Sequence, residues 1–268
     1  MLIENTLFGN RNKINDAIEI LKTFEKKAIE INHDGYLLAD SGGKDSTVIN
    51  HLAKIAGIKH IANYNLTTVD PPELLQFIKK YHQETIINRP SISMYQLIIK
   101  KMMPPTRVCR YCCDHLKERY GKNTIIITGI RRKESKRRSK RKLFETCFRD
   151  SSKIYLNPII DWSTEEVWEY IKMNNVPYCK LYDEGFKRIG CIGCPMTGKE
   201  QRLFEFKRYP KYERMYRRAF DKAVQNKKES GKSYNGSYVK WKTGEDMFNW
   251  WMSDNHQEEN KDQGLFFG

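Results

Sequence analysis

The sequence predicts an α/β protein with a parallel twisted sheet flanked by helices, followed by a helical and basic C-terminal extension. Short β-branched runs alternate with stretches whose apolar residues recur at helical spacing, and this alternation is typical of parallel sheets. A glycine-rich segment also joins the first predicted strand of the sheet to the helix that follows. Such a junction is common in α/β proteins that bind phosphate groups.

The expected elements follow one another in a regular order. An amphipathic helix is predicted over residues 11–33, and further helices over 47–53, from Glu73 onward and over 167–173. A proline pair at 71–72 suits the first turn of the second of these, and a capping box at residues 163–166 suits the start of the last. Strands are predicted at residues 35–39, 60–66, 84–87, 123–129 and 154–160.

The domain organisation follows from this order. Residues 1–200 are expected to form a nucleotide-binding α/β domain that carries all seven cysteines, and residues 201–268 a helical basic extension. No apolar run approaches the roughly 20 residues that cross a bilayer, and the first residues do not resemble a secretory signal. The sequence therefore predicts a cytoplasmic protein with no membrane partner.

The charge balance favours polyanionic partners. The 48 Lys and Arg residues exceed the 33 Asp and Glu residues, for a net charge of +15. A surplus of this size is expected of proteins that bind nucleotides or nucleic acid, although a solvated basic surface explains it equally well.

The glycine-rich segment has the residues that a phosphate site needs. It consists of Ser41, Gly42, Gly43, Lys44, Asp45 and Ser46. Backbone N–H groups at the start of a helix favour an anion, and glycine lets the backbone approach it closely. Lys44 adds a positive charge, and Asp45 is expected to orient a Mg²⁺ ion that bridges phosphates. The alternative is a tight turn with a solvated lysine.

Five of the seven cysteines form two groups. The first contains Cys109, Cys112 and Cys113, and the second contains Cys191 and Cys194, which is followed by proline. An odd number of cysteines in a chain without a recognisable leader argues against a disulfide framework. Thiolates at this spacing suit zinc or an iron–sulfur cluster, and two adjacent cysteines reach different irons more easily than one zinc ion. Buried inert thiols are the remaining alternative.

These motifs resemble known families. The Ser-Gly-Gly-Lys-Asp-Ser segment resembles the PP-loop of the ATP pyrophosphatases. That resemblance implies an adenine-nucleotide α-hydrolase-like, Rossmann-related fold and cleavage of ATP to AMP and pyrophosphate. The cysteine pair followed distantly by C-x₂-C resembles the cluster-bearing branch of the phosphoadenosine phosphosulfate (PAPS) reductase family.

The second resemblance implies a set of ligands. A 4Fe-4S cluster would be held by Cys112, Cys113, Cys191 and Cys194. Lys117, four residues after the cysteine pair, would lie near this cluster. Cys109 would be a spare ligand or a reactive thiol, with a pKa lowered by its arginine neighbours at 107 and 110. Cys147 and Cys179 are interpreted as structural.

Residues after the strand at 123–129 also resemble the family. Gly129, Arg131 and Glu134 match an element that faces the nucleotide. Residues 131–142 contain nine Lys or Arg, and we expect Arg131 to contact the nucleotide or substrate. The later basic residues, and the mixed aromatic and basic residues 203–218, are candidates for nucleic-acid contact or for ordinary surface and packing roles.

Three functions fit these features. In the first, an ATP-using sulfurtransferase, as in the DNA phosphorothioation branch, activates an acceptor with Lys44, Asp45, Arg131 and Cys109 as catalytic residues and a sulfur donor protein as partner. In the second, a reductase converts adenylylsulfate or PAPS to sulfite. An intact PP-loop and the lack of any cysteine after Cys194 argue against it. The third is a non-enzymatic iron–sulfur protein that binds nucleic acid.

Overall fold

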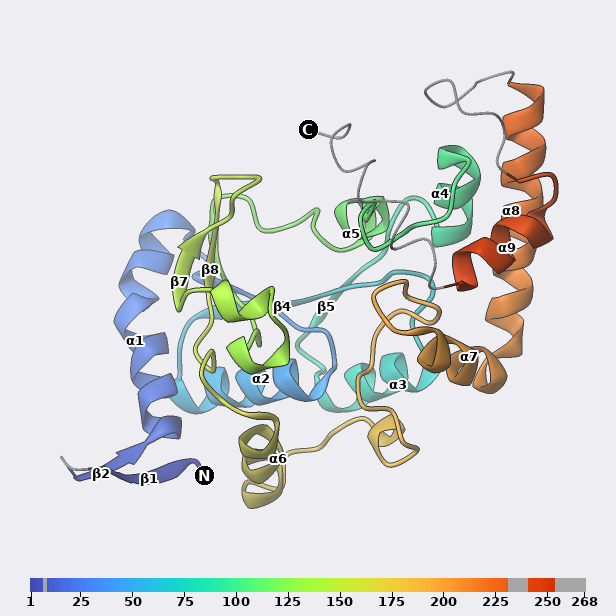
Figure 1. Ribbon diagram of the computed structural model, residues 1–268. Helices are drawn as coiled ribbons and strands as arrows, with labels where there is room; N and C mark the ends of the chain where they lie inside the picture. Colours follow the sequence, from blue (N-terminus) through green and yellow to red (C-terminus); the bar gives the residue numbers. More distant parts are fainter. Residues whose placement is uncertain (7–8, 231–240, 254–268) are drawn as a thin grey trace. The chain divides into compact units, whose positions relative to one another are not determined.

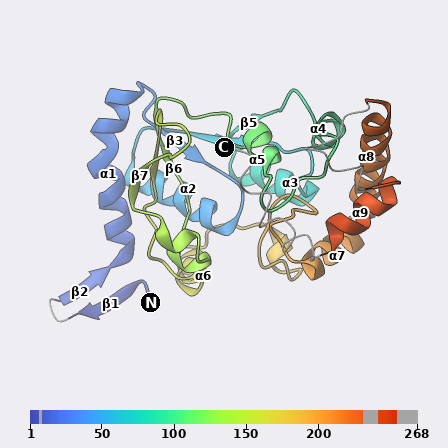
Figure 2. The ribbon, with the colours of Figure 1, turned by 45° about the horizontal axis from the view of Figure 1, so that its top comes forward.

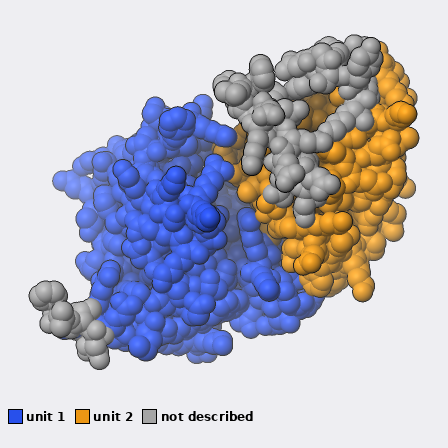
Figure 3. Space-filling view, viewed as in Figure 1, with its two compact units in different colours: residues 1–65, 72–88, 120–189 blue, residues 66–71, 89–119, 190–268 orange. Residues whose placement is uncertain are grey.

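The computed structural model describes residues 1–6, 9–230 and 241–253. The chain forms two compact units, which Figure 3 distinguishes by colour. Unit 1 contains residues 1–65, 72–88 and 120–189, and unit 2 contains residues 66–71, 89–119 and 190–268. The boundary expected at residue 200 does not coincide with this division, and it stays a prediction about domains.

Unit 1 is built on a six-stranded sheet with the order β5-β4-β3-β6-β8-β7. The strands are β3 (Tyr36–Ala39), β4 (His60–Asn65), β5 (Ile86–Asn88), β6 (Thr124–Ile127), β7 (Phe144–Thr146) and β8 (Lys153–Leu156). All neighbouring pairs are parallel except β7 with β8. The predicted parallel sheet flanked by helices is therefore confirmed, and the antiparallel edge strand β7 is an addition.

One predicted strand is shorter than expected. The strand predicted at 154–160 ends at Leu156, and the chain then turns with the amide of Ile160 donating to the carbonyl of Asn157 at 3.1 Å. Pro158 cannot donate to a neighbouring strand, so pairing stops before it. Ile159 and Ile160 remain buried although they leave the sheet.

The helices of unit 1 are α1 (Lys13–Ile31), α2 (Lys44–Ala56), α3 (Pro72–Tyr81) and α6 (Thr164–Met173). Helix α1 packs against α2, which packs in turn against α6 (Figure 1). Their apolar faces meet β3 and β6 in one core, which includes Leu21, Leu38, Leu52, Ile125 and Val167. This apolar surface, removed from water, is the main force that holds unit 1 together.

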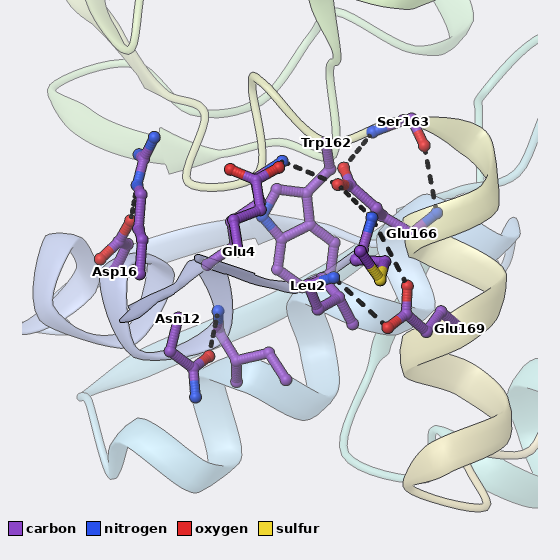
Figure 4. A network of polar contacts seen from close by, with 12 residues as sticks. Leu2, Glu4, Asn12, Asp16, Trp162, Ser163, Glu166 and Glu169 are labelled. Carbon is purple, nitrogen blue, oxygen red and sulfur yellow. Dashed lines mark hydrogen bonds and ion pairs between the residues drawn. The ribbon is translucent and has the colours of Figure 1, made fainter. Parts of the chain in front are cut away.

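A hairpin of β1 (Ile3–Thr6) and β2 (Gly9–Asn12) precedes α1 and was not expected from the sequence. It is tied to α6 by the polar network in Figure 4. Lys13 Nζ pairs with Glu4 at 2.6 Å and with Glu166 at 2.7 Å. Glu166 also completes the predicted capping box, because it accepts the amide of Ser163 at 2.7 Å while Ser163 Oγ accepts the amide of Glu166.

Unit 2 is helical in its described part. It contains α4 (Met94–Lys101), α5 (Tyr111–Leu116), α7 (Lys199–Arg208), α8 (Pro210–Glu229) and α9 (Gly244–Met252). Helix α8 packs against α4 and α9, as Figure 2 also shows. Trp251 is fully buried among the rings of Phe206, Tyr216 and Phe220, and its indole N–H donates to the carbonyl of Pro105 at 2.8 Å. The predicted helical character of the C-terminal part is confirmed for these residues.

Candidate functional site

The glycine-rich segment lies where the connections of the sheet change direction. From β3 the chain proceeds outward through β4 and β5, whereas β6 and β8 lie on the other side of β3. Ligands of open α/β sheets bind at the carboxyl ends of the strands at such a point. The segments that follow β3 and β6 therefore meet at one edge of unit 1.

Close packing explains the glycine that begins the turn. Gly42 has a φ of +65°, in the left-handed region that favours glycine. A Cβ atom there would lie 2.6 Å from Leu74 Cδ1 and 2.9 Å from Ile78 Cδ1. The chain can turn into α2 over these α3 side chains only with glycine at this position.

The start of α2 presents several backbone donors. The N-cap residue, Gly43, supplies no side-chain cap, and the amide of Lys44 donates to the hydroxyl of Tyr182 at 2.9 Å. Within the part of the chain that the structure describes, the amides of Gly43, Asp45 and Ser46 have no hydrogen-bond partner. Open amides at a helix N-terminus make a site for an anion.

The charged side chains beside these amides carry a positive excess. Lys44 and Arg131 are buried, at 7% and 1% exposure, and both pair with Asp45. Lys44 Nζ lies 3.0 Å from Asp45 Oδ2, and Arg131 Nε lies 2.7 Å from Asp45 Oδ1. Because buried charges require compensation, two cations that share one carboxylate leave room for an anion.

The residues after β6 approach the loop directly. A Cβ atom on Gly129 would lie 2.8 Å from the carbonyl carbon of Asp45, so the absence of a side chain permits this contact. Glu134 accepts the amide of Arg131 at 2.9 Å and pairs with Arg138, which shapes the turn. The structure thus brings Gly129 and Arg131 to the glycine-rich segment, while contact of these residues and of Glu134 with a nucleotide stays a prediction.

A buried aspartate, Asp40, holds the glycine-rich segment through hydrogen bonds. The sequence did not indicate this role. Asp40 Oδ1 accepts the amide of Gly42 at 2.9 Å, and Oδ2 lies 2.6 Å from His82 Nδ1 and 2.9 Å from Thr85 Oγ1. Burial opposes ionisation of Asp40, but the hydrogen bonds and the charge of His82 outweigh it and lower the pKa of Asp40. Its position just before the motif was the only sequence signal.

Tyr182 is a second residue that the sequence did not indicate. It lies in the short 3-10 helix η3 (Lys180–Tyr182), and its ring centroid is 5.9 Å from Lys44 Nζ. The separation of 138 residues between Tyr182 and Lys44 hides this contact from any local pattern.

The four predicted cluster ligands all lie in unit 2. Cys112 and Cys113 lie in α5, and Cys191 and Cys194 lie in the turn before α7. Cys191 Sγ is 3.4 Å from Thr67 Oγ1, and burial raises the pKa of Cys191 to about 11. The charges of Cys191 and Cys194 both act on the thiol of Cys112, so the two groups share one neighbourhood.

Cations accompany these thiols. The pKa of Lys117 is raised, first by the charge of Cys191 and further by Asp70, Cys194 and Cys113. Burial opposes this rise, because it disfavours the charged ammonium, so the surrounding negative charges cause it. The pKa of Cys113 is lowered by a hydrogen bond from Cys112 and by Arg110, whose guanidinium lies 3.3 Å from Cys113 Sγ.

Metal ligation requires deprotonated cysteine, which the nearby cations favour at Cys113 and which burial opposes at Cys112 and Cys191. Among the described residues, no three His, Cys, Asp or Glu side chains are positioned to hold a metal ion. The 4Fe-4S cluster and its four ligands therefore stay a prediction.

The expectation of a low pKa for Cys109 is wrong. Burial raises the pKa of this thiol, and a backbone hydrogen bond from Tyr111 and the charge of Lys101 only partly offset it. The neighbouring arginines point elsewhere: Arg107 Nε donates to the carbonyl of Pro195 at 2.9 Å, and Arg110 contacts Cys113. A catalytic role for Cys109 therefore loses its sequence-based rationale.

The basic residues after Arg131 divide into two groups. Arg132, Arg138 and Arg141 pair with Asp161, Glu134 and Glu145, whereas Lys133, Lys136, Arg137, Lys140 and Lys142 lie exposed. Nucleic-acid binding by this surface stays a prediction. No helix among the described residues has the length and apolar character needed to cross a bilayer.

Comparison with known proteins matches residues 35–197 to the phosphoadenosine phosphosulfate reductase domain. An uncharacterized protein of Methanocaldococcus jannaschii is 30% identical over 224 residues, which cover 78% of this chain and 54% of that protein. The adenosine 5'-phosphosulfate reductase of Oceanobacillus iheyensis is 47% identical over 68 residues, which cover 25% of this chain and 28% of the reductase. The chain thus spans about half the length of the first relative and less of the second.

Two solved structures are similar over about two thirds of this chain. The PAPS reductase from Candida auris has a TM-score of 0.48 at 20% identity, covering 66% of this chain and 88% of that one. The FMN adenylyltransferase of Candida glabrata, in complex with FMN and an ATP analog, has a TM-score of 0.49 at 19% identity, covering 67% and 63%.

Proposed function

Because the chain belongs to the phosphoadenosine phosphosulfate reductase domain family, we propose that it binds ATP at the start of α2 and cleaves it to AMP and pyrophosphate. The adenylyl group would pass to an acceptor as pyrophosphate leaves, and a sulfur nucleophile would then displace AMP from the activated acceptor. The observation that carries this proposal is the excess positive charge of Lys44 and Arg131 beside the open amides of Gly43, Asp45 and Ser46. A polyphosphate chain matches both features.

The roles of the residues follow from this arrangement. The open amides of Gly43, Asp45 and Ser46 bind phosphate oxygens, and Lys44 and Arg131 stabilise the negative charge that develops as the phosphoanhydride breaks. The hydroxyls of Ser41 and Ser46 donate within the loop, to Ser46 Oγ and to the carbonyl of Gly43, each at 3.0 Å, and would have to turn to bind a phosphate. Asp45 holds both cations in place, since each of its oxygens pairs with one of them. A Mg²⁺ ion that bridges the phosphates would bind beside Asp45 and shift this pairing.

For the second centre we propose that Cys112, Cys113, Cys191 and Cys194 hold a 4Fe-4S cluster. A bound cluster would supply sulfur or electrons to the reaction. Lys117 and Arg110 would offset its negative charge, and Thr67 would orient Cys191 through the contact at 3.4 Å. Zinc on the same thiolates is the competing assignment.

Reduction of adenylylsulfate or PAPS is the second candidate function. It is favoured by the 47% identity with an adenosine 5'-phosphosulfate reductase over 68 residues. This reaction needs a cysteine nucleophile that takes up the sulfonate and a thiol reductant that releases sulfite. The same anion site would then bind a nucleotide without pyrophosphate.

The test is pyrophosphate release from MgATP by the anaerobically purified protein, with and without DNA or RNA. We expect release that falls by at least about 100-fold in Lys44→Ala, since losing one preorganised charge costs this much in comparable sites. Lys54→Ala is the matched control, because Lys54 lies on the same helix and pairs with Glu84 on the surface.

The possible results of these assays distinguish the three candidate functions. Absence of pyrophosphate under every condition contradicts the proposal. Sulfite release from adenylylsulfate or PAPS with thioredoxin, without ATP cleavage, establishes the reductase instead. Nucleic-acid binding that survives Lys44→Ala without any turnover indicates a non-enzymatic binding protein.

A further inference from the structure

The first amide of α2 is satisfied by a side chain from a distant segment rather than by a cap of its own. Tyr182 Oη accepts the amide of Lys44 at 2.9 Å. The same oxygen lies 3.5 Å from the position of a Cβ atom on Gly43. Tyr182 therefore stands beside the open amides of Gly43 and Asp45, where an anion would bind.

The hydroxyl of Tyr182 keeps its own hydrogen available. A phenol that accepts an N–H bond can donate in turn, and within the described residues no acceptor for the Tyr182 hydrogen is present. Burial raises the pKa of Tyr182, and the charge of Asp45 raises it further, so the hydroxyl stays protonated at neutral pH. A neutral donor thus faces a site with excess positive charge.

The Tyr182 ring is held in place by its neighbours. It packs edge-on against Trp168 at 5.1 Å between centroids and lies 6.5 Å from the ring of Tyr178. The amide of Tyr182 donates to the carbonyl of Cys179 at 3.2 Å, which closes the turn of η3. Moving the phenol away to admit a ligand would break these contacts, so a ligand has to accommodate the hydroxyl.

We propose that Tyr182 is a phosphate-binding residue that extends the anion site of α2. Its hydroxyl accepts the Lys44 amide and donates to an oxygen of the pyrophosphate end of ATP. This inference rests on the proposed function, because it names a further residue of the same site. It predicts selectivity for ligands that carry a pyrophosphate group over those with a single phosphate.

The experiment measures binding of MgATP, pyrophosphate and AMP to the full chain by calorimetry. In Tyr182→Phe we expect MgATP and pyrophosphate to bind about tenfold to a hundredfold more weakly, the range for a lost hydrogen bond to a charged acceptor. Binding of AMP stays unchanged within twofold. Because phenylalanine preserves the packing of the ring, the melting temperature is expected to change little.

Tyr178→Phe is the matched control, since it removes a hydroxyl from the same aromatic group but one that donates to Asp183 at 2.9 Å. It should leave binding of all three ligands unchanged. Tyr182→Leu removes the ring as well as the hydroxyl. Comparison with Tyr182→Phe therefore distinguishes the effect of the hydroxyl from that of the contact between the ring and Lys44.

Three results would overturn the inference. Tighter binding by Tyr182→Phe would mean that the phenol competes with the ligand for the Lys44 amide. Unchanged binding by Tyr182→Phe with weak binding by Tyr182→Leu would assign the effect to the ring. An equal loss of affinity for AMP and for pyrophosphate in Tyr182→Phe would contradict the proposed selectivity for a pyrophosphate group. Failure of the unaltered protein to bind MgATP or pyrophosphate contradicts the proposed function itself, which distinguishes the two failures.

Discussion

Two aspartates five residues apart show how the surroundings of a side chain determine its role. Asp40 is buried and accepts hydrogen bonds from Gly42, Thr85 and His82, so it shapes the loop without facing the ligand site. Asp45 lies at the start of α2 and pairs with Lys44 and Arg131. The first aspartate therefore supports the backbone and the second orients the charges.

Replacement of Asp40 tests this division at the scale of the residue. Asp40→Ala leaves the donors of Gly42, Thr85 and His82 without a partner, and we expect a loss of about 3 to 5 kcal/mol in the free energy of unfolding. Asp40→Asn, which retains an acceptor, should lose less. Urea unfolding at pH 7 measures both, with exposed Asp34→Ala as the control. Equal stability of Asp40→Ala and the unaltered protein would contradict the role.

The pH dependence of the same residue has a definite sign. Because the pKa of Asp40 is lower in the folded protein than in the unfolded chain, its ionised form stabilises the fold above the ordinary aspartate pKa. That contribution is lost as the pH falls through the folded pKa. In Asp40→Asn, the free energy of unfolding should therefore depend less on pH in the acid range.

At the scale of the element, hydrogen bonds and ion pairs at the ends of helices connect separate parts of unit 1. The capping box at the start of α6 is a local signal, and the structure confirms it. Glu166 does more than cap, because its carboxylate also accepts Lys13 from the start of α1. One carboxylate thus joins two helices and, through Lys13, the β1–β2 hairpin.

We expect this junction to respond to acid. Burial opposes ionisation of Glu166, but bonds from Lys13 and the Ser163 amide outweigh it and lower the pKa of Glu166 to about 2. Its stabilisation is present above the unfolded pKa and is lost as pH falls from about 4.5 toward 2. After allowance for solvent screening this amounts to about 1 to 2 kcal/mol.

Glu166→Gln should remove that stabilisation at pH 7, and thermal unfolding at pH 7 and pH 3 measures it. Glu165→Gln, at an exposed position of the same turn, is the control and should cost less at pH 7. A larger effect of Glu165→Gln than of Glu166→Gln would contradict the stabilising role of the Glu166 junction with Lys13.

At the scale of the whole molecule, each unit is assembled from separate stretches of chain. Unit 2 combines residues 66–71, 89–119 and the C-terminal part, and contains all four proposed cluster ligands. The amide of Ile192 donates to the carbonyl of Val69 at 2.8 Å, and Tyr212 Oη donates to the carbonyl of Asp70 at 3.0 Å. A cluster bound to two of these stretches would cross-link unit 2.

Loss of the proposed cluster should therefore affect unit 2 selectively. In Cys191→Ala we expect iron and acid-labile sulfide to disappear together and limited proteolysis to cut within unit 2 sooner. MgATP binding, which depends on unit 1, should persist. Cys147→Ala, outside the ligand set, should keep its iron. Stoichiometric zinc in anaerobically purified protein would contradict the assignment.

The sequence by itself determined the five parallel strands of the sheet, the helices α1, α2, α3 and α6, the capping box of α6 and the place of the glycine-rich segment. These are local features, since hydrophobic periodicity and helix caps depend on neighbouring residues. Membership of the family was also apparent from short motifs, each made of neighbouring residues, although the two cysteine groups lie far apart in the chain.

Only the tertiary structure decided which distant residues act on that segment. The contacts of Tyr182 with Lys44 and of Asp40 with His82 join residues 138 and 42 positions apart, and no local pattern encodes them. The pKa of Cys109 is the opposite case, because neighbours in sequence suggested a low value and burial raised it. Burial and long-range pairing are properties of the folded chain, which is why the charges of the site became interpretable only there.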